Sequence, residues 1–238
     1  MNNLVVRRAM GALVFMVSLT VAAGIASAQD KEVKDAGREA REAANVLSEM
    51  MKKPDDFIPR ELLQKAQGIG IFPGVVKGAF GIGGRFGDGV VSRRTSAGWS
   101  VPVFYDLGGA SFGLQIGVKK TDYIMLFMNE DSMRDVLDGN FEFGGAVSFA
   151  AGPVGRTAGA GTNPTLDAGV LTWSRSKGAF IGASLKGAVL TADNSTNQEV
   201  YGMNGKEILE NPQSVKTAGL PSNITSFNDI IARYAGKP

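Results

Sequence analysis

The sequence of 238 residues contains no cysteine and no histidine. Without cysteine there is no disulfide, no thiol nucleophile and no thiolate metal site. Without histidine there is no Ser-His-Asp triad, no HExxH zinc site and no imidazole base that works at neutral pH. These two absences exclude most hydrolase designs. An enzyme that uses only serine, lysine or carboxylates stays open as an alternative.

The first 28 residues predict a signal peptide. Arg7 and Arg8 form a basic segment, Ala9–Ile25 is an apolar run, and Ala26–Ala28 has the small-x-small pattern of a signal-peptidase site. We expect cleavage after Ala28 and a periplasmic or secreted mature protein. An uncleaved membrane anchor is the alternative, because the run is nearly long enough to span a bilayer.

The mature chain also lacks an excess of charge of either sign. The whole sequence has 25 basic and 23 acidic residues, and the signal peptide holds two of the basic residues and none of the acidic ones. The mature domain therefore carries 23 of each sign and a formal charge of zero. A neutral domain is not attracted as a whole to nucleic acid, so no nucleic-acid partner is predicted.

The N-terminal part of the mature chain has the period of a helix. Lys31–Lys53 predicts an amphipathic helix that ends at Pro54, and a short second helix is expected from Pro59 to Gly68. The N-terminal helices thus occupy residues 31–67. The apolar residues of the first helix recur at three- and four-residue steps, at Val33, Ala36, Ala40, Ala43, Ala44, Leu47, Met50 and Met51.

From residue 69 to 203 the period changes to two, which is the strand period, and predicts a β-rich core. The stretch Lys77–Gly89, KGAFGIGGRFGDG, has glycine at unusual density. Its large residues Phe80, Ile82 and Phe86 share one parity, and its small residues Ala79, Gly81, Gly83 and Gly87 take the other. Glycine weakens a strand, so we expect a second sheet, a helix or an acyl chain to approach this face closely.

These glycines do not fit a phosphate-binding loop. A G-x-G-x-x-G motif that starts at Gly81 needs its third glycine at position 86, where the sequence has Phe86, and Gly87 comes one place late. No helical pattern follows Gly87, and no GxxxxGK[ST] motif is present. The sequence therefore favours strands here over a nucleotide site.

The remaining elements complete a single domain over residues 29–238. YIMLFM at Tyr123–Met128 predicts a strand buried on both faces, Asn129–Asp138 a capped short helix, and Pro221–Tyr234 a helix within a C-terminal helical segment, residues 204–238. The expected class is α+β: a glycine-rich antiparallel sheet or barrel-like sandwich covered by N- and C-terminal helices. A membrane-spanning barrel is a less favoured alternative.

Basic residues are the candidate binding groups. Those of the first helix gather opposite its apolar stripe, where they could contact lipid phosphates or form ion pairs with Asp35 and Glu42 on a solvated face. The others are expected at strand ends or turns, as an anion patch or as ordinary turn charges. The candidates are Lys31, Lys34, Arg38 and Arg41 on the helix, and Arg85, Arg93, Arg94, Arg156, Arg175 and Lys177 in the core.

Several motifs, in order, resemble the SYLF domain, a lipid-binding family also known as a yeast-type actin-binding domain. They are AQGIGIFP (Ala66–Pro73), GGRFGDGVV (Gly83–Val91), GWSVPVFYDLGGASFGLQIG (Gly98–Gly117), AAGPVGR (Ala150–Arg156) and WSRSKGAFIGASLKG (Trp173–Gly187). The resemblance implies a non-enzymatic module that binds phosphoinositide-containing membranes, partly through a basic N-terminal segment, and in some members actin filaments. Lys31, Lys34, Arg38 and Arg41 are the counterpart of that segment here.

The sequence therefore predicts an exported, non-enzymatic protein that binds lipid or an anionic membrane surface. Its expected partner is anionic phospholipid, and a protein partner is a further expectation. The alternative is a structural or host-interaction protein, including an actin-filament binder by family resemblance. No cofactor and no metal site is predicted.

Overall fold

The protein is described here from a computed structural model. It describes residues 31–52, 58–80, 82–111, 117–144, 148–153, 168–176, 179–183 and 185–236. The predicted signal peptide, Met1–Ala28, and the core cations Arg156 and Lys177 lie outside these residues.

The predicted helices form at the expected places. An N-terminal helix occupies residues 31–52, a short helix follows Pro59, and a 14-residue helix closes the described chain. The labelled helices are α2 (Arg60–Lys65), α3 (Glu130–Leu137), α4 (Asn194–Tyr201), α5 (Gly205–Glu210), the 3-10 helix η3 (Pro212–Ser214) and α6 (Ser222–Ala235). Asn129 caps α3 by accepting a hydrogen bond from the Ser132 amide at 2.9 Å.

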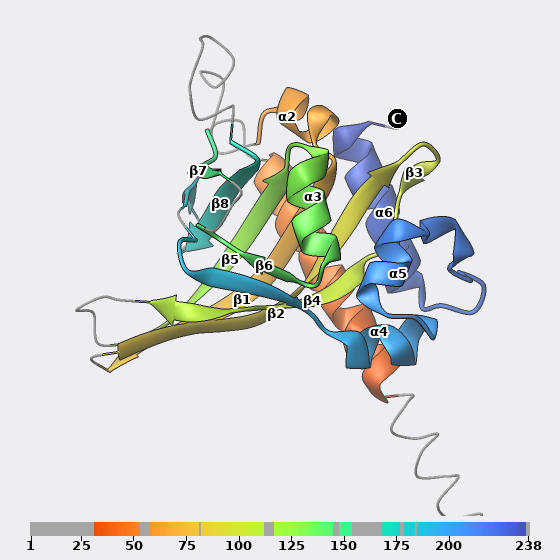
Figure 1. The fold of residues 1–238 in the computed structure, drawn as a ribbon, viewed down its shortest axis with the longest axis horizontal. Coiled ribbons are helices and arrows are strands. Elements are labelled where there is room, and N and C mark those ends of the chain that lie inside the picture. The colour runs from red at the N-terminus through yellow and green to blue at the C-terminus, as the bar shows by residue number, and fades with distance from the viewer. Residues whose placement is uncertain are drawn as a thin grey trace, which may run out of the picture.

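Ten strands form one strongly curled sheet (Figure 1). They are β1 (Gly68–Phe80), β2 (Ile82–Thr95), β3 (Gly98–Trp99), β4 (Val103–Ser111), β5 (Gly117–Phe127), β6 (Asn140–Glu142), β7 (Phe149–Ala151), β8 (Val170–Ser176), β9 (Ala179–Gly182) and β10 (Ala188–Ala192). The order is β6-β10-β4-β2-β1-β5-β8-β7, with β3 beside β2 and β9 beside β8. The α+β class is confirmed. The sheet is mixed rather than purely antiparallel, because β7 runs parallel to β8.

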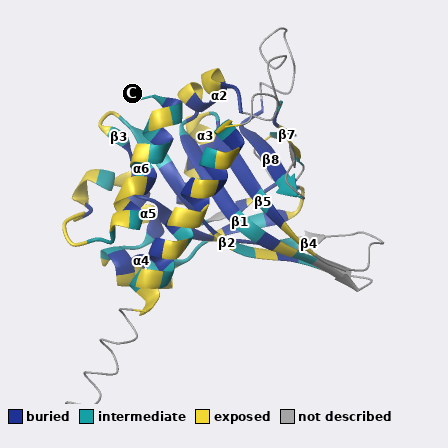
Figure 2. Ribbon diagram, turned by 180° about the vertical axis from the view of Figure 1, so that it is seen from behind, coloured by how far each residue is buried: buried dark blue, intermediate teal, exposed yellow. Residues whose placement is uncertain are grey.

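The two faces of the sheet are covered by different helices. The α6 face packs against the N-terminal helix, α2 and α6, and its core includes Ile71, Phe104 and Trp173. The α3 face packs against α3 and α5, and its core includes Phe72 and Tyr105. Figure 2 shows the N-terminal helix and α6 lying across one face, and Figure 1 shows α3 in front of the other.

Strand β5 confirms the expectation for Tyr123–Met128. Residues 123–127 are all buried, with Ile124 and Leu126 in the core of the α6 face and Tyr123 in that of the α3 face. A strand that is apolar at both parities therefore lies near the centre of the sheet, between β1 and β8.

The glycine-rich stretch is extended, as expected. β2 runs from Ile82 to Thr95 without a following helix, so Gly83 and Gly87 belong to a strand; Gly81 lies outside the described residues. At Gly87 the close neighbour is the adjacent strand β1. A methyl group at Gly87 would come within 2.9 Å of the Val75 Cα atom, because β1 bulges between Phe72 and Val75.

Within residues 69–203, where the sequence predicted strands and the short helix at Asn129–Asp138, the structure has a further helix. The strands end at Ala192, and α4 occupies Asn194–Tyr201. Asp193 caps this helix with its side chain, and Gly202 ends it at a φ of 68°. The β-rich core therefore ends about ten residues before Met203.

Candidate functional site

The four basic residues of the N-terminal helix are all exposed, as expected. Arg38 pairs with Asp35 at 3.2 Å and lies 4.0 Å from a Glu42 oxygen, so this residue follows the ion-paired alternative. Lys31, Lys34 and Arg41 form no ion pair with any residue that the structure describes. Three cations of the helix thus remain available to an external anion.

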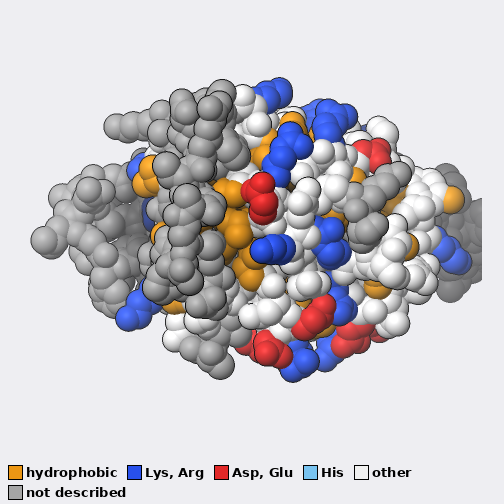
Figure 3. Space-filling view, turned by 90° about the horizontal axis from the view of Figure 1, so that it is seen from above, with side chains coloured by type: hydrophobic (Ala, Val, Ile, Leu, Met, Phe, Trp, Pro, Cys, Tyr) orange, Lys and Arg blue, Asp and Glu red, His pale blue; other side chains and the backbone are white. Residues whose placement is uncertain are grey.

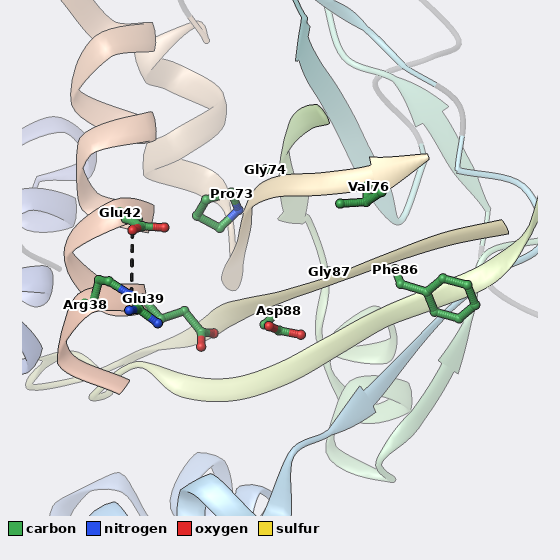
Figure 4. Close-up of a pocket in the computed structure, with 9 residues that line it drawn as sticks. All are labelled: Arg38, Glu39, Glu42, Pro73, Gly74, Val76, Phe86, Gly87 and Asp88. Atoms are coloured by element: carbon green, nitrogen blue, oxygen red, sulfur yellow. Dashed lines mark ion pairs between the residues drawn. The ribbon is translucent and has the colours of Figure 1, made fainter. Parts of the chain in front are cut away.

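A groove separates this helix from the β1–β2 hairpin (Figure 4). Its volume is about 440 Å³. Two hydrophobic side chains are exposed in it: Phe86 has 69% of its surface exposed and Val76 has 38%. The residues that line the groove are Arg38, Glu39, Glu42, Pro73, Gly74, Val76, Phe86, Gly87 and Asp88.

Phe86 is held on the surface by glycines around it. A methyl group at Gly84 would come within 2.8 Å of the Phe86 ring, and one at Gly108, directly across on β4, would lie 3.9 Å from it. The ring therefore covers a part of the sheet that has no side chains. The large residue of this alternating stretch is thus the one that reaches solvent.

Carboxyl groups lie beside the groove on the same face. Burial raises the pKa of Glu39 to about 9, with further increases from the charges of Asp88, Asp193 and Asp106. Burial likewise raises the pKa of Asp106, which lies directly opposite Asp88 on the neighbouring strand. At neutral pH Glu39 is therefore uncharged, which lowers the negative charge of the groove.

The sequence suggested that Arg85 lies at a strand end or in a turn, but the residue lies within a strand. It is the fourth residue of β2, its side chain belongs to the α3 face, and only 6% of its surface is exposed. Its Nε and Nη1 atoms are buried without a hydrogen-bond partner. Lys77 is directly opposite it on β1, and the Lys77 ammonium lies 5.3 Å from the centre of the Tyr123 ring.

The side chains of Arg93 and Arg94 form hydrogen bonds and an ion pair within the protein. Arg94 donates to the carbonyls of Leu63 and Ala66, both at 2.7 Å, at the end of α2, and its guanidinium lies 4.4 Å from the centre of the Trp99 ring. Arg93 donates to the Leu209 carbonyl at 3.2 Å and pairs with Glu130 at 3.0 Å. Both line a second depression of about 720 Å³ beside Leu209–Ser214.

Arg175 joins three elements. It pairs with Asp122 on β5 and with Glu49 on the N-terminal helix, so it fastens that helix to the sheet. The candidate cations thus do not gather into one anion patch in the part of the chain that is described. On the face that Figure 3 shows, basic and acidic side chains are intermixed.

Sequence reasoning did not single out Phe86, Glu39, Lys77 or Tyr123 as site residues. Phe86 carried a signal, because it is a large residue between glycines at a position where a sheet surface is usually polar. Glu39 carried one as well, since it is an acid next to the buried Ala36 and Ala40 of the helix. Lys77 and Tyr123 are brought to Arg85 by strand pairing, which the sequence does not encode locally.

Two chemical features are absent from the described residues. Within these ranges no group of three acidic side chains is placed to hold a metal ion. No helix in the described part of the chain has the length and apolarity needed to cross a membrane.

Comparison with known proteins gives the relationship of the chain. The family model described as "Ysc84: Las17-binding protein actin regulator" matches residues 108–233, which are 126 of the 238 residues. Protein YSC84 of Saccharomyces cerevisiae is 34% identical over 194 residues, covering 77% of this chain and 41% of the yeast protein. SH3 domain-containing YSC84-like protein 1 of Xenopus laevis is 33% identical over 171 residues, covering 69% of this chain and 51% of the relative.

A second yeast relative, LAS seventeen-binding protein 3, is 33% identical over 175 residues, covering 70% of this chain and 38% of the relative. This chain therefore spans about two fifths to one half of the length of these relatives. The family description and the name of LAS seventeen-binding protein 3 describe binding proteins, and none of these names describes an enzyme. The matches confirm the resemblance drawn from the motifs: the chain belongs to the Ysc84 family, whose shared module is the SYLF domain.

Proposed function

We propose that this protein binds lipid at an anionic membrane surface and catalyses no reaction. The observation that carries the proposal is the exposure of Phe86, at 69%, beside Val76 on the face that also holds the N-terminal helix. Large exposed apolar side chains next to cations are typical of surfaces that contact a bilayer. We further propose that the protein does this after export, as its predicted signal peptide suggests.

In the proposed mechanism, the β1–β2 hairpin makes the apolar contact with the membrane and the N-terminal helix makes the electrostatic contact. Phe86 and Val76 enter the boundary between headgroups and acyl chains, where their exposed apolar surface leaves water. Lys31, Lys34 and Arg41 contact lipid phosphates, each contributing about 1 kcal/mol near an anionic surface. The helix itself stays on the sheet, because its Ala36 and Ala40 are buried there.

Vesicle flotation tests the apolar part of this proposal. Vesicles of phosphatidylcholine alone and of phosphatidylcholine with phosphatidylglycerol are compared with the purified protein. We expect binding to the anionic vesicles only, and a loss of roughly tenfold in Phe86→Ser. Ile181→Ser is the matched control. Ile181 is 61% exposed but lies on β9, which pairs with β8 and is separated from β2 by β1, β5 and β8.

A charge series tests the electrostatic part. The double variant Lys34→Gln/Arg41→Gln is expected to bind anionic vesicles roughly tenfold or more weakly. The control Lys206→Gln removes an exposed cation that pairs with Asp138 at 3.0 Å, away from the groove. Equal binding to neutral and anionic vesicles, or equal losses in the Lys34/Arg41 and Lys206 variants, would refute the electrostatic part.

A protein partner is the second candidate function, and the family matches favour it. The matching family is described as an actin regulator, and one relative is named for binding Las17. We propose actin-filament binding as the alternative for this chain. Co-sedimentation with filaments separates the two functions: pelleting with filaments but not with anionic vesicles would favour the partner over the membrane.

A further inference from the structure

Three cations lie in one row across neighbouring strands of the α3 face. In the sheet Lys77 on β1 is paired directly with Arg85 on β2 and with Lys119 on β5. The three side chains lie on the same face of the sheet as the Tyr123 side chain. The strand alternation places residues 77, 85 and 119 on the face that holds Val75 and Tyr123. Like charges opposite each other destabilise a sheet, so this row needs a physical reason.

No acidic side chain in the described part of the chain forms an ion pair with these three cations. The acids nearest in the strands are Asp88, Asp106 and Asp122, and their parity places them on the α6 face. None of the three cations forms an ion pair with a described residue. The row is therefore a local excess of positive charge inside the fold.

Arg85 makes the excess costly. It is 6% exposed, and its Nε and Nη1 donors are buried without acceptors. A buried guanidinium without a counter-ion is strongly unfavourable in a protein interior. Lys77 shows the same strain, since burial and the charge of Arg85 both lower its pKa.

We propose that Arg85 and Lys77, with Lys119 at the rim, bind one oxyanion on the α3 face. The ligand chemistry is a phosphate or carboxylate group, because guanidinium and ammonium donors pair with those oxygens by strong charge-assisted hydrogen bonds. The Tyr123 ring, which is 1% exposed, adds an apolar wall beside the ammonium. Either a free anion or the head of an amphiphile has this chemistry.

This site is separate from the proposed membrane contact. Phe86 and the N-terminal helix lie on the α6 face, whereas the cation row lies on the opposite face of the same strands. Loss of one function is thus not expected to remove the other. Phe86→Ser should keep its affinity for phosphate, and Arg85→Met should keep its binding to anionic vesicles.

Thermal stability with added ligand tests the proposal on the purified protein. The probes are inorganic phosphate against chloride at equal ionic strength, and dodecyl phosphate against dodecanol. We expect Tm to rise with phosphate or dodecyl phosphate, as linkage requires for a ligand of the folded state. The apparent affinity should fall roughly 10- to 100-fold in Arg85→Met and in Lys77→Met.

The controls make each outcome decisive. Lys216→Met removes an exposed cation outside the sheet and should leave the affinity unchanged. An equal response to phosphate and dodecyl phosphate assigns a free oxyanion, and a response at least tenfold stronger to dodecyl phosphate assigns an amphiphile head. The proposal is overturned if neither probe raises Tm in the wild type, or if Lys77→Met, which keeps Arg85, responds like the wild type.

Without ligand, Arg85→Met should be more stable than the wild type, because the variant no longer buries an unpaired charge. A variant that folds but is less stable than the wild type would contradict the assignment of an unpaired buried charge to Arg85. Should the variant not fold, the titration of Lys77→Met decides the matter alone.

Discussion

At the scale of one residue, Gly89 shows why strand β2 contains glycines in place of larger residues. A methyl group at this position would clash with the carbonyl oxygen of Ile71 and with the Phe72 ring on β1. The first of these is backbone at the start of the β1 bulge, so it cannot move aside cheaply. We expect Gly89→Ala to lower the free energy of unfolding by about 1–3 kcal/mol.

Gly108 is the matched control on the neighbouring strand. A methyl group there would meet only the Phe86 ring, at 3.9 Å, which is ordinary contact. Gly108→Ala should therefore change the free energy of unfolding by less than about 0.5 kcal/mol, or raise it slightly through the unfolded state. Urea unfolding of both variants checks the pair, and equal losses would mean that the tight fit at Gly89 is not the cause.

Glu39 predicts how the stability changes with pH. Its pKa is raised from 4.5 to about 9 in the folded chain, so folding favours the protonated form. The stability from this group is complete below about pH 4.5 and is lost as the pH rises toward 9, by up to about 1.4 kcal/mol per pH unit. Glu39→Gln keeps a neutral side chain and should remove this loss.

Urea midpoints of the wild type and Glu39→Gln between pH 5 and 9 measure the effect. The two curves should diverge as the pH rises, with the variant the more stable at pH 9. Glu32→Gln serves as control, because it removes an exposed acid of the same helix that is not among the charges that raise the pKa of Glu39. Parallel curves for Glu39→Gln would refute the burial of an uncharged Glu39.

The sequence lists the basic residues, but it did not predict which of their side chains are buried in the fold. Arg38 is exposed on a helix whose apolar stripe identifies its outer face, so its place followed from the period. Arg85 lies in a strand where small residues occupy one parity and no clear polar face exists. Alternation therefore could not tell that the parity of Arg85 faces the core.

At the scale of elements, the helices with an apolar stripe were predictable and α4 was not. The N-terminal helix and α6 each bury a periodic set of apolar residues. Helix α4 is polar, with Asn197 and Val200 as its buried residues. It is held by hydrogen bonds of the Asn197 side chain to both backbone groups of Phe104, each at 3.0 Å. Such non-local bonds leave no period in a sequence, although Asp193 and Gly202 offered capping signals.

Arg94 fixes helix α2 against β2. Its two hydrogen bonds, both at 2.7 Å, satisfy the Leu63 and Ala66 carbonyls that a helix end leaves without partners. We expect Arg94→Ala to lower the free energy of unfolding by about 1–3 kcal/mol. Arg94→Lys should not restore it, because an ammonium group cannot reach both carbonyls and stack on Trp99 in the same way.

Arg134 is the control for this element. It forms an exposed pair with Asp131 at 3.2 Å within α3, and 68% of its side chain is exposed. Arg134→Ala should change the free energy of unfolding by less than about 0.5 kcal/mol, measured by urea unfolding beside the Arg94 variants. A full rescue by Arg94→Lys would show that charge alone matters at the end of α2.

At the scale of the molecule, the sheet class could be predicted but its order could not. Period-two patterns predicted strands, and the apolar run Tyr123–Met128 predicted a strand buried on both faces. The pairing of β10 with β4 and β6, however, joins segments that are about 50 to 80 residues apart. Such pairing depends on long-range packing, and for the same reason the row of Lys77, Arg85 and Lys119 could not be predicted from the sequence.

The position of the N-terminal helix on the whole fold also decides how the membrane contact works. The proposed mechanism keeps this helix on the sheet, although a basic amphipathic helix could instead leave it and insert alone. A methyl group at Gly37 would lie 3.8 Å from the Asn223 Cβ atom of α6, which is the Cβ spacing of a disulfide. Because the chain has no cysteine, Gly37→Cys/Asn223→Cys introduces the only thiols.

We expect this pair to oxidise readily, and the oxidised protein to bind anionic vesicles as well as the reduced protein does. The disulfide holds the helix against α6 but leaves Phe86, Lys34 and Arg41 exposed, so a contact made by the folded surface loses nothing. The double serine variant at positions 37 and 223 controls for the substitutions themselves. Binding by the reduced form alone would mean that the helix must leave the sheet, and the groove would then not be the membrane-binding surface.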